Sequence, residues 1–159
     1  MRIPKIYLET TTFNYYFDAD RDAHADTVTL FDRCAAGKFE PYTSTYVIDE
    51  INKTKDEVKR ENMLALIDKY NMAVLIESDE ANELADKYIE AGAMPPGSLT
   101  DARHIAITSI SDLDVIVSLN FNHIVRATTI RLTEAINKVR GYNAVAIDTP
   151  MGVLSNENG

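Results

Sequence analysis

Short apolar runs alternate with longer amphipathic segments along this chain. Residues 6–8 and 115–117 are uninterrupted apolar runs, which is typical of interior strands buried on both faces. Residues 73–76 and 145–147 have the same character, and residues 40–44 predict a shorter extended piece. These runs are therefore predicted to be the strands of a sheet.

Helical periodicity fills the segments between the runs. A helix is expected near residues 22–37, where Gly37 ends it. Thr54 to Glu57 has the form T-x-x-E of a capping box, which predicts the start of another helix. Apolar residues recur along one face of that helix, namely Met63, Leu66, Ile67 and Tyr70. A further helix begins with acids near residue 79, where they suit the helix dipole, and ends at Gly92.

One helix is predicted to be buried. It follows the Pro/Gly-rich break AGAMPPGSLT, residues 91–100, which is too short to be a domain linker. In SLTDARHIAITSI, residues 98–110, Thr100 can cap a helix whose first turn carries Asp101. The body of this segment is almost wholly apolar, so we expect the helix to lie inside the protein.

Strands that are apolar on both faces and separated by helices predict an α/β fold with a mainly parallel sheet and helices on both sides. The chain has 159 residues and is 45% hydrophobic, which suits one compact domain. We place this domain at residues 1–150. Residues 151–159 are predicted to be a polar tail, and its end, SNENG at residues 155–159, is expected to be mobile.

Composition narrows the setting of the protein. The single cysteine, Cys34, falls in a helical apolar pattern and excludes an internal disulfide, as expected in a reducing compartment. No apolar run approaches a membrane span, and we expect a cytoplasmic protein with no membrane partner. The net charge of −9 argues against general nucleic-acid affinity, although basic residues near the acidic positions could form a local site.

Polar side chains follow the predicted strands. Glu9 ends the first strand, Glu50 follows the apolar run 46–48, and an Asn-rich segment, Ser118 to His123, follows the strand at 115–117. Together with Asp101, these positions suggest one acidic pocket at the carboxyl ends of the strands. Glu9 and the segment after residue 117 fit that edge directly, whereas Glu50 and Asp101 would have to be delivered by helices that start or cross there. Three carboxylates so close raise one another's proton affinity or require a cation. Oxygen ligands favour Mg²⁺ or Mn²⁺, which activates water and neutralises charge on a phosphodiester.

Four segments in order resemble the motifs of a PIN domain, closest to the small prokaryotic VapC-type toxin-like proteins. They are KIYLETTTFNYYFD (5–18), YVIDEI (46–51), TDARHIAI (100–107) and DVIVSLNFNHIV (114–125). The resemblance covers nearly the whole chain. It implies a three-layer α/β/α fold and a ribonuclease site that depends on a divalent metal. In toxin members it also implies dimerisation and an antitoxin partner.

The resemblance assigns the candidate site by position. Glu9 matches the first-strand acid, Glu50 the acid after the second strand, Asp101 the acid that opens the buried helix, and Asn120 the fourth acidic position. Two positions depart from the family. Glu9 replaces the usual aspartate, and its extra methylene moves the carboxylate by about 1 Å, which matters where Mg²⁺ distances are tightly constrained. Asn120 can ligate through oxygen but brings no charge, so the site is predicted to be weak, shifted in metal preference, or silent.

Other polar residues near these motifs are assigned supporting roles. Thr11 stands where the family often has a serine or threonine after its first acid, and Ser118 follows the strand at 115–117. His104 lies one helical turn after Asp101; we expect it, like His123, to pack or to hydrogen-bond behind the acids. An aromatic cluster follows the first strand and is predicted to be core or dimer interface rather than a base-stacking surface. Its members are Phe13, Tyr15, Tyr16 and Phe17.

The leading hypothesis is a metal-dependent endoribonuclease of the PIN-domain type that cleaves RNA with Mg²⁺ or Mn²⁺. A narrower form of this hypothesis is the toxin of a toxin-antitoxin pair, with an antitoxin partner and a homodimeric state. The main alternative is a catalytically degenerate PIN domain that acts as a binding or regulatory module. A phosphatase or nucleotide hydrolase that uses the same acids is a third hypothesis. A Rossmann-type binder is disfavoured because no G-x-G-x-x-G or P-loop follows a strand.

Overall fold

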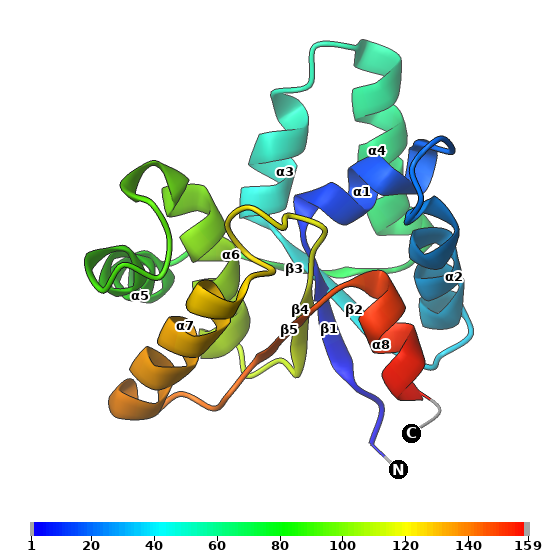
Figure 1. Cartoon of the computed structure of the whole chain (residues 1–159). Coiled ribbons are helices and arrows are strands. Elements are labelled where there is room, and N and C mark those ends of the chain that lie inside the picture. The colour runs from blue at the N-terminus through cyan, green and yellow to red at the C-terminus, as the bar shows by residue number, and fades with distance from the viewer. Residues whose placement is uncertain (1, 158–159) are drawn as a thin grey trace.

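The computed structural model describes residues 2–157, in which five strands form one parallel sheet of order β3-β2-β1-β4-β5. The strands are β1 (Lys5–Leu8), β2 (Glu40–Ser44), β3 (Ala73–Leu75), β4 (Val115–Val117) and β5 (Ala146–Asp148). Helices α5, α6 and α7 cover one face of the sheet, and α2 and α8 cover the other (Figure 1). The predicted three-layer α/β/α sandwich is confirmed, and all strand pairs are parallel.

The helices connect successive strands. They are α1 (Thr10–Phe17), α2 (His24–Ala35), α3 (Thr45–Asn52), α4 (Glu57–Lys69), α5 (Asp79–Glu90), α6 (Leu99–Ile110), α7 (Ala127–Arg140) and α8 (Pro150–Glu157), with a short 3₁₀ turn, η1, at Pro96–Ser98. Because every strand points the same way, the segments that leave β1, β2 and β4 all emerge at one edge of the sheet (Figure 1). That edge carries the candidate site.

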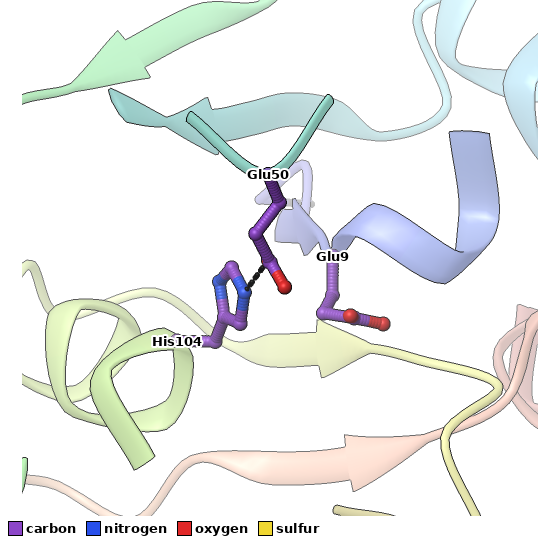
Figure 2. Close-up of side chains that lie close together, drawn as sticks. All are labelled: Glu9, Glu50 and His104. Atoms are coloured by element: carbon purple, nitrogen blue, oxygen red, sulfur yellow. Dashed lines mark hydrogen bonds and ion pairs between the residues drawn. The ribbon is translucent and has the colours of Figure 1, made fainter. Parts of the chain in front are cut away.

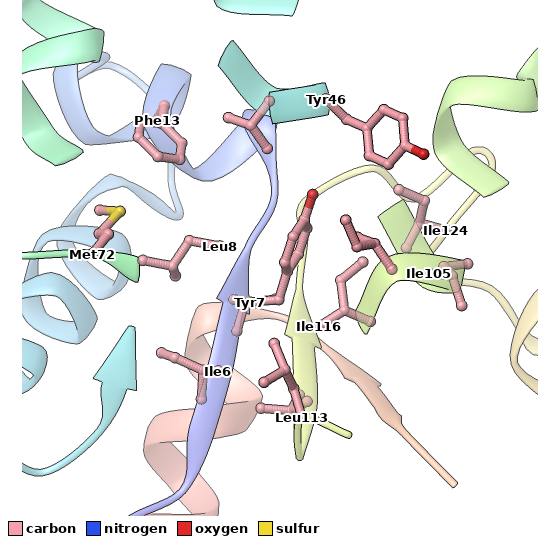
Figure 3. Packing of buried hydrophobic residues seen from close by; sticks show 14 of the residues in the cluster. Ile6, Tyr7, Leu8, Phe13, Tyr46, Met72, Ile105, Leu113, Ile116 and Ile124 are labelled. Atoms are coloured by element: carbon pink, nitrogen blue, oxygen red, sulfur yellow. The ribbon is translucent and has the colours of Figure 1, made fainter. Parts of the chain in front are cut away.

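The core lies between the sheet and its two helical layers. The central strand β1 is buried on both faces, with Ile6, Tyr7 and Leu8 all at 0% exposure, as its apolar run predicts (Figure 3). Helix α6 is buried along most of its length, and Ile105 packs against the central strands. The prediction of a buried helix at residues 98–110 is confirmed.

Two predicted helix starts are wrong in detail. No side chain caps α6, which begins at Leu99 directly after η1, so Thr100 lies inside the helix and not at its cap. The N-cap of α4 is Asp56, whose side chain accepts a hydrogen bond from the Lys59 backbone N–H, and Thr54 lies outside the helix. Aspartate binds the free amides of a first turn at least as well as threonine, so two adjacent candidates leave the cap ambiguous from sequence.

Helices α1, α3, α7 and α8 occupy segments for which we predicted no helix, and the first two carry candidate site residues. The threonine cluster after β1 begins α1, with Glu9 as the N-cap whose side chain accepts from the Thr11 N–H. The apolar run 46–48 lies in α3, which Ser44 caps through a contact to the Val47 N–H. Glu50 therefore sits on a helix after β2, as its delivery to the sheet edge requires.

The expected mobile tail is also wrong over the part that the structure describes. Residues 150–157 form α8, which packs on α2. Val153 is buried, and Arg33 of α2 bonds to the Glu157 carboxylate. Pro150 suits a first helical turn, where its missing N–H costs nothing. Residues 158 and 159 of the predicted tail lie outside the described residues. Within residues 2–157, no helix is long and apolar enough to cross a membrane.

Candidate active site at the carboxyl edge of the sheet

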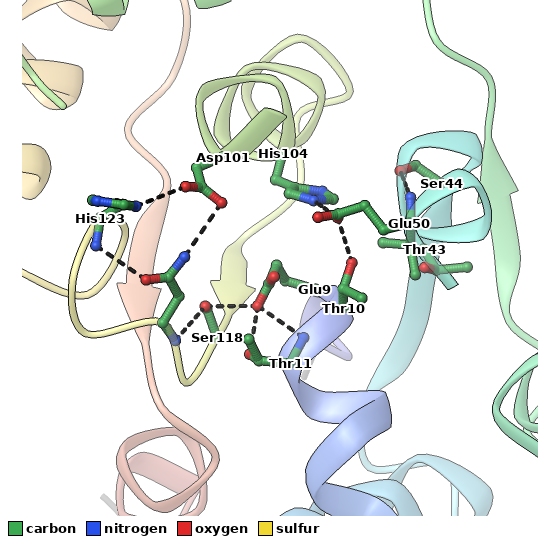
Figure 4. A network of polar contacts seen from close by, with 12 residues as sticks. Glu9, Thr10, Thr11, Thr43, Ser44, Glu50, Asp101, His104, Ser118 and His123 are labelled. Atoms are coloured by element: carbon green, nitrogen blue, oxygen red, sulfur yellow. Dashed lines mark hydrogen bonds and ion pairs between the residues drawn. The ribbon is translucent and has the colours of Figure 1, made fainter. Parts of the chain in front are cut away.

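The carboxyl ends of β1, β2 and β4 bring the candidate residues together (Figure 4). Glu9 follows β1, and its backbone N–H still bonds to Val117 at the end of β4. Glu50 comes from α3, one and a half turns after β2, while Asp101 comes from the first turn of α6. Helices thus deliver two of the three acids to the edge that the strands define.

Glu9 is the most deeply buried acid, at 2% exposure. Its Oε1 accepts hydrogen bonds from Thr11 Oγ1 at 2.5 Å, Ser118 Oγ at 2.7 Å and the Thr11 N–H at 3.2 Å. The Thr11 hydroxyl in turn accepts from the Leu119 N–H at 2.8 Å, so it links α1 to the segment after β4. Thr11 and Ser118 therefore orient one oxygen of Glu9, and no described residue donates to the other, Oε2.

A buried chain of hydrogen bonds holds Glu50 from behind. His104 Nε2 lies 2.5 Å from Glu50 Oε1, which also accepts from the Thr10 hydroxyl at 2.6 Å. The other ring nitrogen, Nδ1, lies 2.6 Å from the Tyr7 hydroxyl, which is 2.7 Å from Ser44 Oγ. His104, Tyr7 and Ser44 are all fully buried. As with Glu9, the described residues give Glu50 Oε2 no donor.

Asp101 has different partners. Its Oδ1 accepts from Asn120 Nδ2 at 3.2 Å, and its Oδ2 lies 3.1 Å from His123 Nδ1. Asn120 Oδ1 accepts from the His123 backbone N–H at 3.0 Å. The amide at the fourth position is thus used to fix the segment after β4 against α6. Asn120 lies beside the acids, as the resemblance implies, but it contributes a donor to Asp101.

Burial and mutual repulsion set the protonation of the acids. Burial raises the pKa of Glu9 and of Asp101, and in both cases the nearby His104 only partly offsets it. Burial would also raise the pKa of Glu50, but its hydrogen bond to His104 and the charge of that ring outweigh this and lower it. Burial by itself would lower the pKa of His104, and the bond and charge of Glu50, with Glu9 and Asp101, raise it. His104 is the internal counter-charge of the acids.

Three of these side chains could hold a cation together. One ligand atom from each of Glu9, Glu50 and His104 lies within 4.8 Å of the others (Figure 2). Asp101 is not in this group of three, because its oxygens face Asn120 and His123. The donor set fits a divalent ion, since two carboxylates each keep one oxygen that no described residue bonds. Sequence reasoning placed His104 behind the acids, and only its spacing of one turn from Asp101 signalled that it reaches the cluster.

The aromatic cluster after β1 belongs mainly to the core. Phe13 is fully buried, and Tyr16 packs against Phe31 while its hydroxyl lies 2.6 Å from that of Tyr70. Phe17 is 43% exposed. For Phe13 and Tyr16 these contacts support the core interpretation over base stacking.

The fold has a counterpart among known structures. The chain is similar to one from the crystal structure of VapBC2 from Rickettsia felis bound to a DNA fragment from their promoter. The TM-score is 0.56 over 91% of this chain and 98% of that one, at 12% sequence identity. No protein-family model matches the sequence, and no curated protein matches it. The protein therefore has a PIN-like, VapC-like fold.

Proposed function

We propose that the protein is a divalent-metal-dependent endoribonuclease of the PIN-domain type. The observation that carries this proposal is the state of Glu9 and Glu50. Each carboxylate is held through Oε1 by several donors, while the described residues leave its Oε2 without one. Oriented carboxylates with an unbonded oxygen, at the carboxyl edge of a parallel sheet, are suited to binding a cation. The VapC-like fold supports the same assignment.

The residues of the chain have separate roles in this proposal. Glu9 and Glu50 hold the ion, and Asp101 faces the same pocket from α6. A divalent ion at this position supplies water activation and neutralises charge on the phosphodiester. Thr11 and Ser118 fix the direction of Glu9 through hydrogen bonds of 2.5 and 2.7 Å. Asn120 donates to Oδ1 of Asp101 and so fixes the position of this carboxylate beside Glu9 and Glu50.

The proposed substrate is RNA, bound locally and not by the overall charge of −9. Lys53 directly follows α3, and its charge adds to the larger effects of His104 and Thr10 that lower the pKa of the Glu50 carboxyl. A cation beside the acids is suited to a phosphate next to the scissile bond. This arrangement favours a phosphodiester over a neutral substrate.

We further propose that the protein is the toxin of a toxin-antitoxin pair and acts as a homodimer with an antitoxin protein as partner. The support is the likeness in fold to a chain of the VapBC2 complex. Co-expression with the product of the adjacent reading frame, followed by size-exclusion chromatography, tests both claims. A monomer that retains no second chain would contradict them.

A second candidate function is a catalytically degenerate PIN domain that serves as a binding or regulatory module. It is favoured by Asn120, which brings no charge, and by His104, which already balances part of the acidic charge. The two functions differ in metal binding. Saturable binding of Mn²⁺ supports the nuclease, and its absence supports the degenerate module.

Cleavage of total RNA by the purified protein with Mn²⁺ tests the nuclease directly. We expect cutting that EDTA stops and that Asp101→Asn abolishes while the circular dichroism spectrum stays unchanged. Asp86→Asn, an exposed position on α5, is the matched control and should cut at the wild-type rate. Full activity in Asp101→Asn would contradict the assignment of this site.

A further inference from the structure

The acidic pocket contains a nitrogen donor as well as oxygen donors. His104 extends from α6 towards the Glu50 carboxylate, with Glu9 nearby, and an atom of each lies within 4.8 Å of the others (Figure 2). The imidazole is 0% exposed, so it is shielded from bulk solvent. This donor set differs from the oxygen-only set that Glu9, Glu50 and Asp101 would form.

The ring of His104 is fixed in the orientation that a metal ligand needs. Ligating histidines usually bond their second ring nitrogen to a partner that sets the tautomer and the ring plane. Here Nδ1 lies 2.6 Å from the Tyr7 hydroxyl, and that hydroxyl lies 2.7 Å from Ser44 Oγ. In the metal-free protein Nε2–H donates to Glu50. With Nδ1–H donating to Tyr7 and Tyr7 donating to Ser44, a metal ion that displaces the Nε2 proton meets a lone pair already directed at the carboxylates. Both partners are fully buried, which holds the chain in one arrangement.

The carboxylates need little movement to share an ion with this nitrogen. Two neighbouring ligands of one ion, each bonded at ~2.1 Å, lie roughly 3 Å apart. His104 Nε2 is 2.5 Å from Glu50 Oε1, so moving these two atoms apart by about 0.5 Å lets both bind one ion. Glu50 Oε2 can also bind the ion without breaking a hydrogen bond, because no described residue donates to it. The bonds from Thr11 and Ser118 hold Glu9 Oε1, so its Oε2 remains for the ion.

Resting on the proposed function, we infer that His104 is a direct metal ligand and that its nitrogen makes the site select a first-row transition ion, Mn²⁺, over Mg²⁺. Magnesium prefers an all-oxygen, near-octahedral shell and gives up its water reluctantly. Imidazole binds transition ions better. The pairing of a buried histidine with two glutamates thus has a consequence for metal choice that the oxygen ligands alone would not give.

The test uses Mn²⁺ bound to the folded, metal-stripped protein with all histidines labelled with ¹⁵N. Pulsed electron paramagnetic resonance detects a nitrogen bonded to Mn²⁺ whether or not the protein cleaves RNA. We expect one ¹⁵N coupling in the wild type and in His123→Gln, and none in His104→Gln. Saturable Mn²⁺ binding with no nitrogen coupling in the wild type would overturn the inference, as would a coupling that survives in His104→Gln.

Selectivity gives a second reading of the same inference. The affinities are measured by competition of Mg²⁺ against bound Mn²⁺. In His104→Gln the affinity for Mn²⁺ should be at least tenfold weaker than in the wild type, which is about the loss that follows removal of a residue supporting a metal ligand. The affinity for Mg²⁺ should change far less. Equal losses for both ions would overturn the claim of selectivity. A nitrogen-coupled Mn²⁺ without RNA cleavage would refute the nuclease and leave this inference standing, whereas the absence of saturable Mn²⁺ binding refutes both.

Discussion

Replacing Tyr7 by phenylalanine tests whether the buried hydrogen-bond chain behind His104 supports both metal binding and the stability of the core. The Tyr7 hydroxyl bonds to His104 Nδ1 at 2.6 Å and to Ser44 Oγ at 2.7 Å, and all three side chains are fully buried. The variant keeps the ring that packs in β1 and leaves two buried polar atoms without this partner. Each such atom costs about 1–3 kcal/mol, and Ser44 Oγ keeps its contact to the Val47 N–H, so we expect a loss of about 2–4 kcal/mol in the free energy of unfolding. For a chain of this size that lowers Tm by roughly 5–15 °C.

Tyr88→Phe, between α5, α6 and α7, is the matched control outside the acidic pocket. Tyr88 is also fully buried, and its hydroxyl bonds to Asn137 Oδ1 and lies 3.2 Å from Ser109 Oγ. Ser109 keeps its bonds to the Ile105 carbonyl and to Asn137 Nδ2, so mainly one acceptor is orphaned and we expect a loss of about 1–3 kcal/mol. Both variants are therefore destabilised by similar mechanisms, and only one touches the site.

The assay combines urea unfolding with Mn²⁺ titration of the two variants. Because Tyr7 holds the His104 ring, Tyr7→Phe should weaken Mn²⁺ binding about 10–100-fold, the usual range for such supporting residues, while Tyr88→Phe leaves it unchanged. Equal Mn²⁺ affinity in the two variants would refute the role of Tyr7. Wild-type stability in Tyr7→Phe would refute the buried hydrogen-bond chain itself.

The remaining predictions concern pH and the C-terminal helix. The raised pKa of His104 means that its contribution to stability is complete below about pH 6.5 and is lost as pH rises through its folded-state pKa. The lowered pKa of Glu50 adds stability that is lost only as pH falls through that lower value. On the alkaline side the loss from His104 remains, so urea unfolding of the metal-free protein should show stability that declines as pH rises. His104→Gln should flatten that decline. In α8, Val153→Ser should cost about 2 kcal/mol because Val153 is buried, whereas Met151→Ser, 62% exposed, should cost little in the same assay; equal costs would mean that α8 does not pack as described.

The sheet was predictable because its signal is local. Uninterrupted apolar runs such as residues 6–8 and 115–117 require burial on both faces, which a parallel sheet between two helical layers provides. The buried helix α6 was predictable for the same reason. Helix α8 was not, because one buried valine in a short polar segment gives little periodicity, and its packing on α2 depends on contacts distant in sequence.

The candidate site shows the same division between local and distant information. That acids follow strands is visible in the sequence, and so is their convergence at one edge of a parallel sheet. The partners of each acid are not visible, because they depend on side-chain directions across different elements. His104 reaches Glu50 across 54 residues and Ser118 reaches Glu9 across 109. Delivery of Glu50 by a helix was expected, but the turn of α3 that directs it towards His104 was not visible in the sequence.

Calorimetric titration of Mn²⁺ into the metal-stripped protein, beside Glu9→Gln, tests most directly whether the carboxyl edge of the sheet is a metal site. Glutamine keeps the acceptor oxygen for Thr11 and Ser118 and removes only the charge and one oxygen, and Glu61→Gln, exposed on α4, is the control. The account predicts one saturable binding event in the wild type and in Glu61→Gln that is lost in Glu9→Gln. No saturable binding in the wild type, or equal binding in Glu9→Gln, would contradict it.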